Sequence, residues 1–175
     1  MTTYVSTTVH QNVSTGQAQA ATDEQHAQRW VGHLRQCRYF QKFSDVELLQ
    51  VARLCREVGF ARGETVIVGG SRRQVAYLIT RGEAGMFFKG SAEEMPLDRV
   101  GPGMLLGAFA IISPGTVTGF GFKALADITA LRISGREFQQ LCEANPKVGY
   151  DFASELAIAL NRRVYDMYYR LQELR

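Results

Sequence analysis

One long stretch of this sequence lacks charged side chains. Between Gly101 and Phe122 there is no Lys, Arg, Asp or Glu, although 21% of the 175 residues are charged. Glycines recur in this stretch, where they would let the backbone turn tightly around a small molecule. A charged ligand held there would find no side chain of opposite sign to pair with.

Histidine is absent after residue 40, and cysteine is scarce throughout. The sequence has three of each and no HxH, HExxH or CxxC pattern: His10, His26, His33, Cys37, Cys55 and Cys142. A metal site in the later part of the chain would have to use carboxylates and thiols alone, which is uncommon. We therefore expect no metal and no cofactor, and we expect the cysteines to be reduced and at least partly buried.

Long apolar runs are missing as well. The longest, Met104–Ile112, is about half of a membrane span, and the N-terminus has no basic segment followed by an apolar stretch. The formal net charge of +3 is mild, and no basic run indicates nucleic acid binding. With 46% apolar residues, the sequence predicts one globular domain in the cytoplasm, without membrane attachment.

The first part of the chain divides into an arm and a helical segment. Residues 1–21 are uncharged and rich in Thr, Gln, Ser and Ala, so we expect a flexible N-terminal arm, with a partner-binding arm as the alternative. Residues 22–56 contain two capping-box patterns, Thr22–Gln25 and Ser44–Glu47, each followed by apolar residues at helical spacing. We predict N-terminal helices over this segment.

Residues 57–133 have the pattern of short strands. Apolar or alternating runs, separated by glycine-rich turns, cover residues 64–68, 75–79, 84–88, 104–112, 118–125 and 128–133. Many short strands with regular turns predict a sandwich or barrel. The predicted fold class is mainly β: a double-stranded β-helix, or jelly-roll, barrel of about eight strands with flanking helices.

Residues 134–175 return to helical patterns. Ser134–Glu137 is a third capping box, and Asn145-Pro146 places a capping residue before a proline at the first helical position. The last helix carries apolar residues at alternating spacings of four and three: Ala153, Ala157, Leu160, Val164, Met167, Leu171 and Leu174. This heptad seam is typical of helices that pair with helices. It favours a homodimer or larger homo-oligomer, with a helix lying on its own barrel as the alternative.

This order of elements, from about Phe40 onward, resembles the cyclic nucleotide-binding domain of bacterial catabolite activator proteins and of protein kinase A regulatory subunits. The resemblance rests on stretches in the family's order and spacing: Phe60–Ile67, Gly70, Val75–Gly82, Leu97–Gly103 and Phe138–Pro146. It implies a β-roll with a phosphate-binding cassette inside the uncharged stretch. The activator proteins continue into a helix-turn-helix domain that this sequence does not contain, so we expect no direct DNA binding by that route.

The resemblance also implies which residues form the ligand pocket. They are Gly103, Gly107, Ala108, Phe109, Ala110, Thr118 and Gly119. In the family, a Glu after the second glycine accepts a hydrogen bond from the ribose 2′-hydroxyl, and an Arg after the apolar turn pairs with the cyclic phosphate. Ala108 and Thr118 stand at those two positions here. The activator protein's adenine contacts would fall near Arg163 and Val164, where the residues also differ.

Three functions remain open from the sequence. The first is a non-enzymatic regulatory or assembly module that acts through its C-terminal helix, on a second copy or on another protein, with cyclic nucleotide binding lost. The second is a sensor that binds cyclic nucleotide weakly, or an apolar or planar ligand in the same pocket, where Phe109, Phe120 and Phe122 are candidates. The third, an enzyme of the cupin kind, would need a histidine cluster inside the barrel. Since that cluster is absent, we expect no enzymatic activity.

Overall fold

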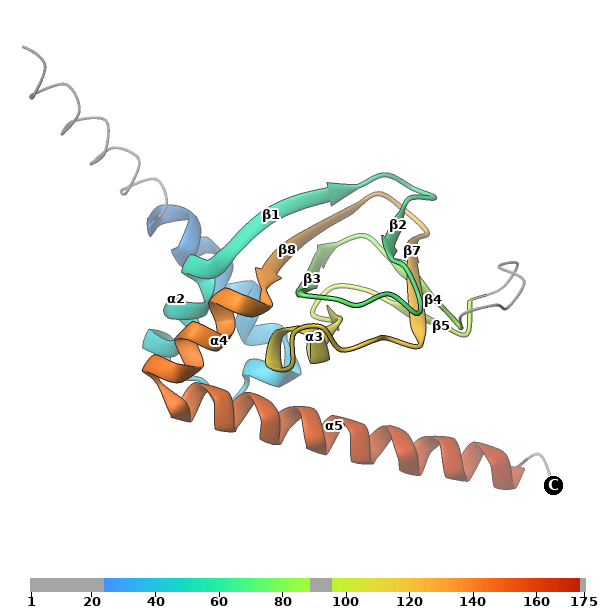
Figure 1. Cartoon of the computed structure of the whole chain (residues 1–175). Coiled ribbons are helices and arrows are strands. Elements are labelled where there is room, and N and C mark those ends of the chain that lie inside the picture. The colour runs from blue at the N-terminus through green and yellow to red at the C-terminus, as the bar shows by residue number, and fades with distance from the viewer. Residues whose placement is uncertain (1–23, 89–95, 174–175) are drawn as a thin grey trace, which may run out of the picture.

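The computed structural model describes residues 24–88 and 96–173. It consists of a β-roll with a group of helices at one end, and one long helix that runs along the roll (Figure 1). The predicted arm over residues 1–21, the first two residues of Thr22–Gln25, and Leu174 at the end of the heptad seam lie outside the described residues.

The helices before the roll follow the sequence pattern closely. Residues 24–36 are helical, a 3-10 turn η1 covers Arg38–Phe40, and helix α2 covers Asp45–Leu54. Ser44 caps α2 with a complete capping box: its hydroxyl accepts from the N–H of Glu47, and its own N–H donates to the Glu47 carboxylate at 2.8 Å. Two otherwise unpaired donors at the helix start are satisfied in this way, which is why the helix begins here.

The described residues form eight strands in two antiparallel sheets. The strands are β1 (Cys55–Phe60), β2 (Thr65–Ile67), β3 (Val75–Arg81), β4 (Ala84–Phe88), β5 (Asp98–Val100), β6 (Leu105–Leu106), β7 (Phe120–Ala124) and β8 (Ile128–Ser134). One sheet has the order β1-β8-β3-β6 and the other β2-β7-β4-β5. Together with the flanking helices, these sheets confirm the predicted jelly-roll fold class.

Some of the expected strands have different limits. The apolar run Met104–Ile112 divides into the short strand β6 and the helix α3 (Ala108–Ile112), and Cys55 begins β1 although the pattern extended the preceding helix to it. Strands β1 and β5 were not among the expected runs. An apolar run of this length has the same composition in a buried strand and in a buried helix, so composition alone cannot divide it.

Two apolar clusters hold the roll and the helices together. The first lies between the helices and the β1-β8-β3-β6 sheet and contains Phe40, Phe138 and Phe152, all fully buried. The second fills the inside of the roll with residues such as Ile67 and Ile79. Each large side chain buried in these clusters stabilises the fold by about 1.5–3 kcal/mol.

Helix α4 (Gly135–Ala144) leads directly into helix α5 (Pro146–Glu173). The 28 residues of α5 span about 42 Å. Its first turns are anchored by Phe152, whose ring lies 5.1 Å from Phe138 and 5.5 Å from Phe40, centroid to centroid. After Leu156, every described residue of α5 except Ala159 is exposed, and this part of the helix runs alongside the β-roll (Figure 1).

Candidate functional site

The turn that opens the cassette is set by glycines with left-handed backbone. Gly103 has φ 84°, and its N–H donates to the carbonyl oxygen of Ile79 at 2.9 Å. Gly107, with φ 74°, is the N-cap of α3, and a side chain added there would place its Cβ 3.2 Å from the carbonyl oxygen of Val75. Because the backbone at position 107 has a positive φ and a carbonyl oxygen lies close to it, only glycine fits there without strain.

Helix α3 offers apolar groups where a ligand-binding cassette needs polar ones. Ala108, Ala110 and Ile111 are buried, and Ala108 belongs to the apolar cluster beneath the helices. Phe109 points outward, with 44% of its surface exposed. Ala108 therefore contributes a buried methyl group at the position where the family's carboxylate would accept the ribose hydroxyl.

The segment after α3 is bonded to the loop between β2 and β3. The carbonyl oxygen of Thr118 accepts from the N–H of Gly70 at 2.6 Å, and the N–H of Gly115 donates to the carbonyl of Arg73 at 2.6 Å. The Thr118 hydroxyl donates to the carbonyl of Phe120 at 3.1 Å, so it is bonded within its own segment. No cation stands at position 118, and the hydroxyl there stabilises the turn.

Two arginines near the cassette were not singled out from the sequence. Arg72 donates to the carbonyl oxygen of Gly115 at 3.3 Å, and Arg73 donates to the hydroxyl of Ser71 at 3.0 Å. The Arg72 side chain thus connects the loop to the cassette, whereas the Arg73 side chain is bonded within the loop. Arg72 lies 43 residues from its partner in the chain, so no local pattern could have indicated this contact.

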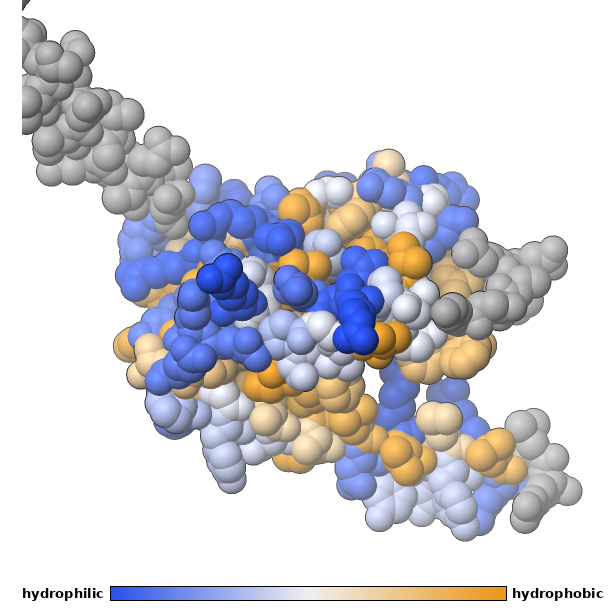
Figure 2. All heavy atoms as spheres, in the orientation of Figure 1, coloured by the Kyte–Doolittle hydropathy of each residue, from blue (hydrophilic) through white to orange (hydrophobic). Residues whose placement is uncertain are grey.

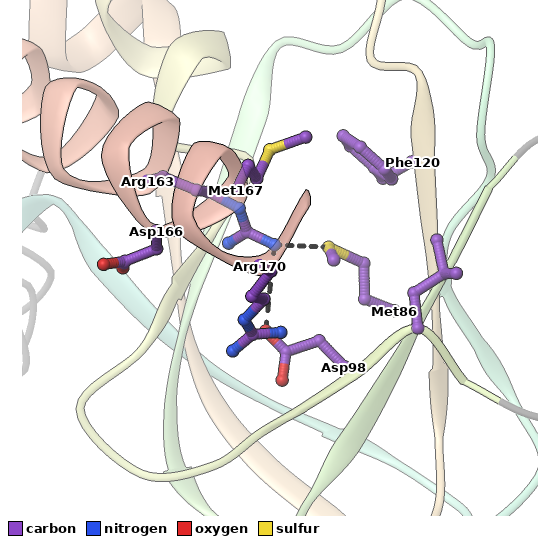
Figure 3. Close-up of a pocket in the computed structure, with 8 residues that line it drawn as sticks. Met86, Asp98, Phe120, Arg163, Asp166, Met167 and Arg170 are labelled. Carbon is purple, nitrogen blue, oxygen red and sulfur yellow. Dashed lines mark hydrogen bonds and ion pairs between the residues drawn. The ribbon is translucent and has the colours of Figure 1, made fainter. Parts of the chain in front are cut away.

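A second candidate site is a groove between α5 and the strands β4, β5 and β7 (Figure 3). It has a volume of about 330 Å³ and is lined by Met86, Leu97, Asp98, Phe120, Arg163, Asp166, Met167 and Arg170. The Arg163 guanidinium reaches across it, with one nitrogen 3.7 Å from the sulfur of Met86 and 3.7 Å from a carboxylate oxygen of Asp98. From the sequence, Arg163 was identified only as a departure from the family's adenine contacts.

The heptad residues of α5 lie beside this groove-facing edge. The helix turns by about 100° from one residue to the next. The residues that face the domain or line the groove are each followed by a heptad residue: Leu156 by Ala157, Arg163 by Val164, and Arg170 by Leu171. The six heptad residues within the described part of α5 are all exposed. Met167 lies at the boundary, because it also lines the groove. The structure therefore places these residues in one row, adjacent to the edge that meets the roll.

The cysteines are protected thiols. Burial raises the pKa of Cys37 to about 11 and that of Cys55 to about 12, and it also raises the pKa of the half-buried Cys142. At neutral pH all three thiols are therefore protonated and weak nucleophiles. Within the described ranges, no group of three or more His, Cys, Asp or Glu side chains is arranged to hold a metal ion.

The chain combines two four-stranded sheets, a short helix that begins at a glycine, and a long helix along the roll. This combination is typical of cyclic nucleotide-binding folds. A family model described as "Cyclic nucleotide-binding domain" matches residues 57–145, and the chain belongs to that family. The members of this family are regulatory, ligand-sensing domains, and the resemblance seen in the sequence is thereby confirmed. A search of curated proteins found no match.

Solved structures agree with this assignment. The N-terminal domain of a transcriptional regulator from Streptomyces coelicolor is 25% identical, with a TM-score of 0.64 over 77% of this chain and 93% of that one. The catabolite activator protein of Thermus thermophilus is 22% identical, with a TM-score of 0.63 over 78% and 62%. The regulatory subunit of a cAMP-independent protein kinase A from Trypanosoma brucei is 15% identical, with a TM-score of 0.68 over 85% and 50%. For the membrane question, none of the helices in the described part of the chain is long and apolar enough to span a bilayer.

Proposed function

We propose that this chain is a non-enzymatic regulatory or assembly module that acts by pairing its helix α5 with a second copy, and that its cassette has lost cyclic nucleotide binding. The observation that carries the proposal is the row of exposed apolar side chains on α5. Leu160, Val164, Met167 and Leu171 expose 41–65% of their surface along one edge of the helix. Such a row is costly to leave in water, since burying each large side chain is worth about 1.5–3 kcal/mol.

The residues beside this row suit close pairing of two helices. Ala153 and Ala157 are small and exposed, so two copies of α5 can approach closely near the anchored end of the helix. The charged residues Arg162, Asp166, Arg170 and Glu173 were expected to flank the row. Two of them, Asp166 and Arg170, line the groove toward the roll, so charge contributes little to the pairing edge. Apolar burial is therefore the main driving force of the proposed dimer.

The cassette supports the second half of the proposal. Cyclic nucleotide binding in this family depends on a carboxylate and a guanidinium, and the buried Ala108 and the self-bonded Thr118 supply neither. The two missing groups together account for about two to three orders of magnitude in affinity. The fold is compatible with such a loss, because the Trypanosoma brucei regulatory subunit with the same fold belongs to a kinase that is cAMP-independent.

The assembly is tested by light scattering across a range of protein concentrations. We expect a mass near twice the monomer's 19.5 kDa for the wild type, and a monomer for the variant Val164→Asp with Leu171→Asp. Both side chains are more than half exposed, so these changes leave the monomer's core intact. The matched control is Tyr165→Asp with Tyr169→Asp, two equally exposed residues on another face of α5, which should remain dimeric. A monomeric wild type, or a seam variant that still forms dimers, would contradict the proposal.

A further inference from the structure

Strand β1 is an open edge of its sheet. Among the described strands it pairs only with β8, which lies on one side of it. Figure 1 shows β1 at the rim of the roll, on the side away from α5. An open edge presents backbone N–H and C=O groups with which another extended chain can pair.

The backbone groups of Glu57 and Gly59 point outward from this edge. In an antiparallel pair, successive residues direct their N–H and C=O groups alternately toward the partner strand and away from it. The N–H of Cys55 donates to the carbonyl oxygen of Ala52 in α2, outside the sheet, so Cys55 belongs to the outward set. Glu57 and Gly59 follow it at alternate positions and are exposed, and their backbone groups bond to no other described residue.

One face of the sheet beside this edge carries two arginines on adjacent strands. Arg56 of β1 lies directly opposite Arg132 of β8, and like charges in such a cross-strand pair repel each other. Arg56 donates to the carbonyl oxygens of Cys55 and Arg53 at 2.7 Å and 3.0 Å, which holds it at the end of α2. Arg132 is partly exposed and forms no hydrogen bond or ion pair within the described part of the chain.

Within strands β1, β8 and β3, this face has no carboxylate to neutralise the arginines. Its further residues on β1 are Val58 and Phe60, and the Phe60 ring meets Tyr77 of β3 edge to face at 5.3 Å. Glu57 points to the opposite face, where its carboxylate lies 3.5 Å from Arg29. Figure 2 shows hydrophilic side chains over the start of β1 and hydrophobic ones further along it. A strand added to β1 therefore meets positive charge at one end and apolar side chains at the other.

We propose that β1 binds an extended acidic peptide segment of a partner protein as an additional strand. The main chain of the segment bonds to Glu57 and Gly59, which is recognition by β-strand addition. Its alternate side chains place a carboxylate beside Arg56 and Arg132, since a guanidinium pairs bidentately with a carboxylate, and an apolar residue beside Val58. Nucleic acid would use the arginines but not the backbone groups of the edge, so these observations favour a peptide. The surface is separate from α5, and the inference does not rest on the proposed dimer.

The proposal is tested by fluorescence anisotropy of the full chain with a labelled, end-blocked peptide. Threonine alternates in it first with valine and then with glutamate, because antiparallel pairing brings the end of the peptide beside Arg56. A peptide with glutamine in place of glutamate reports strand pairing without charge, and a single-stranded oligothymidylate reports charge without strand pairing. We expect the glutamate peptide to bind at least about tenfold more tightly than either, because it alone uses both parts of the surface.

The contribution of the main chain is measured with N-methylated forms of the glutamate peptide. Methyl groups on the residues whose N–H groups face β1 should abolish binding, and methyl groups on the alternate residues should leave it unchanged. Amide hydrogen exchange then locates the added strand. At saturation the N–H groups of Glu57 and Gly59 should exchange at least about tenfold more slowly, whereas those of Val58 and Phe60, which already face β8, should not change.

Matched substitutions test the role of the arginines. Arg132→Gln should weaken binding of the glutamate peptide by about threefold to tenfold, while Arg162→Gln, at an exposed arginine of α5, should leave it unchanged. The proposal is overturned if the glutamate peptide does not bind at millimolar concentration, if the glutamine peptide or the oligothymidylate binds equally well, if both methylated forms bind like the parent, if Glu57 and Gly59 stay unprotected, or if the two arginine variants have the same effect. Dimerisation is measured separately by light scattering, so a failure here is distinguishable from a failure of the proposed function.

Discussion

The Nζ of Lys147, in the first turn of α5, lies 3.1 Å from the Oε1 of Glu47 in α2, although 100 residues separate them in the sequence. The same carboxylate completes the capping box of α2 through Ser44. Lys147 also pairs with Asp151 one turn further along α5, at 2.7 Å. A single buried carboxylate therefore holds the start of α2 and the start of the long helix together.

The charge of Glu47 should stabilise the fold at neutral pH. The N–H of Ser44, followed by its hydroxyl and Lys147, holds the pKa of Glu47 below its ordinary value, although burial opposes the shift. A lowered pKa means that this stabilisation is present above the carboxyl's unfolded pKa and is lost as the pH falls through the folded one. We expect Glu47→Ala to lower the free energy of unfolding at pH 7 by about 1–2 kcal/mol, as measured by urea denaturation.

The substitution Glu47→Gln separates charge from capping. Gln can still accept the N–H of Ser44, so it should cost less than Ala, and its difference from wild type should diminish as the pH falls through the lowered pKa of Glu47. Glu137→Gln is the control, because Glu137 holds the same position in α4 and is exposed. If the free energy of unfolding of Glu47→Gln fell with decreasing pH as steeply as that of the wild type, other carboxylates would determine the pH dependence.

The left-handed glycines of the cassette should differ in their tolerance of alanine. Gly107 and Gly115 both have positive φ, but a Cβ at Gly107 would crowd the carbonyl oxygen of Val75 at 3.2 Å, whereas nothing lies within 4 Å of a Cβ at Gly115. We expect Gly115→Ala to cost about 1 kcal/mol from backbone strain and Gly107→Ala to cost more, about 1–3 kcal/mol. Equal costs in denaturant titrations would mean that α3 shifts freely and that the cassette is not held by the packing around Gly107.

The sequence predicted the parts of this fold that depend on local chemistry. Ser44 and Glu47 have the capping-box spacing, and the box is present in full, whereas Ser134–Glu137 at the start of α4 forms only the bond from the Glu137 N–H to the Ser134 hydroxyl. Gly103 and Gly107 were identified from the family's spacing, and both adopt the left-handed backbone that such turns need. The heptad row on α5 was found because its period is a property of one helix alone.

Features that depend on the packing of distant segments could not be predicted. Arg72 bonds to the cassette turn across 43 residues, and Arg163 reaches Met86 across 77. The groove exists because α5 lies along the roll with Arg163 facing inward, and the heptad pattern does not specify that rotation. The division of Met104–Ile112 into a strand and a helix likewise depends on where β3 offers a pairing edge for Leu105 and Leu106.

The most direct test of the central claim, that this family fold no longer binds the family's ligand, is calorimetric titration with cyclic AMP and cyclic GMP. The account predicts dissociation constants no tighter than about 1 mM for the wild type, because Ala108 and Thr118 replace both charged groups of the cassette. The double variant Ala108→Glu with Thr118→Arg should bind more tightly than the wild type, since the backbone of the cassette is retained. A low-micromolar constant for the wild-type protein would contradict the account.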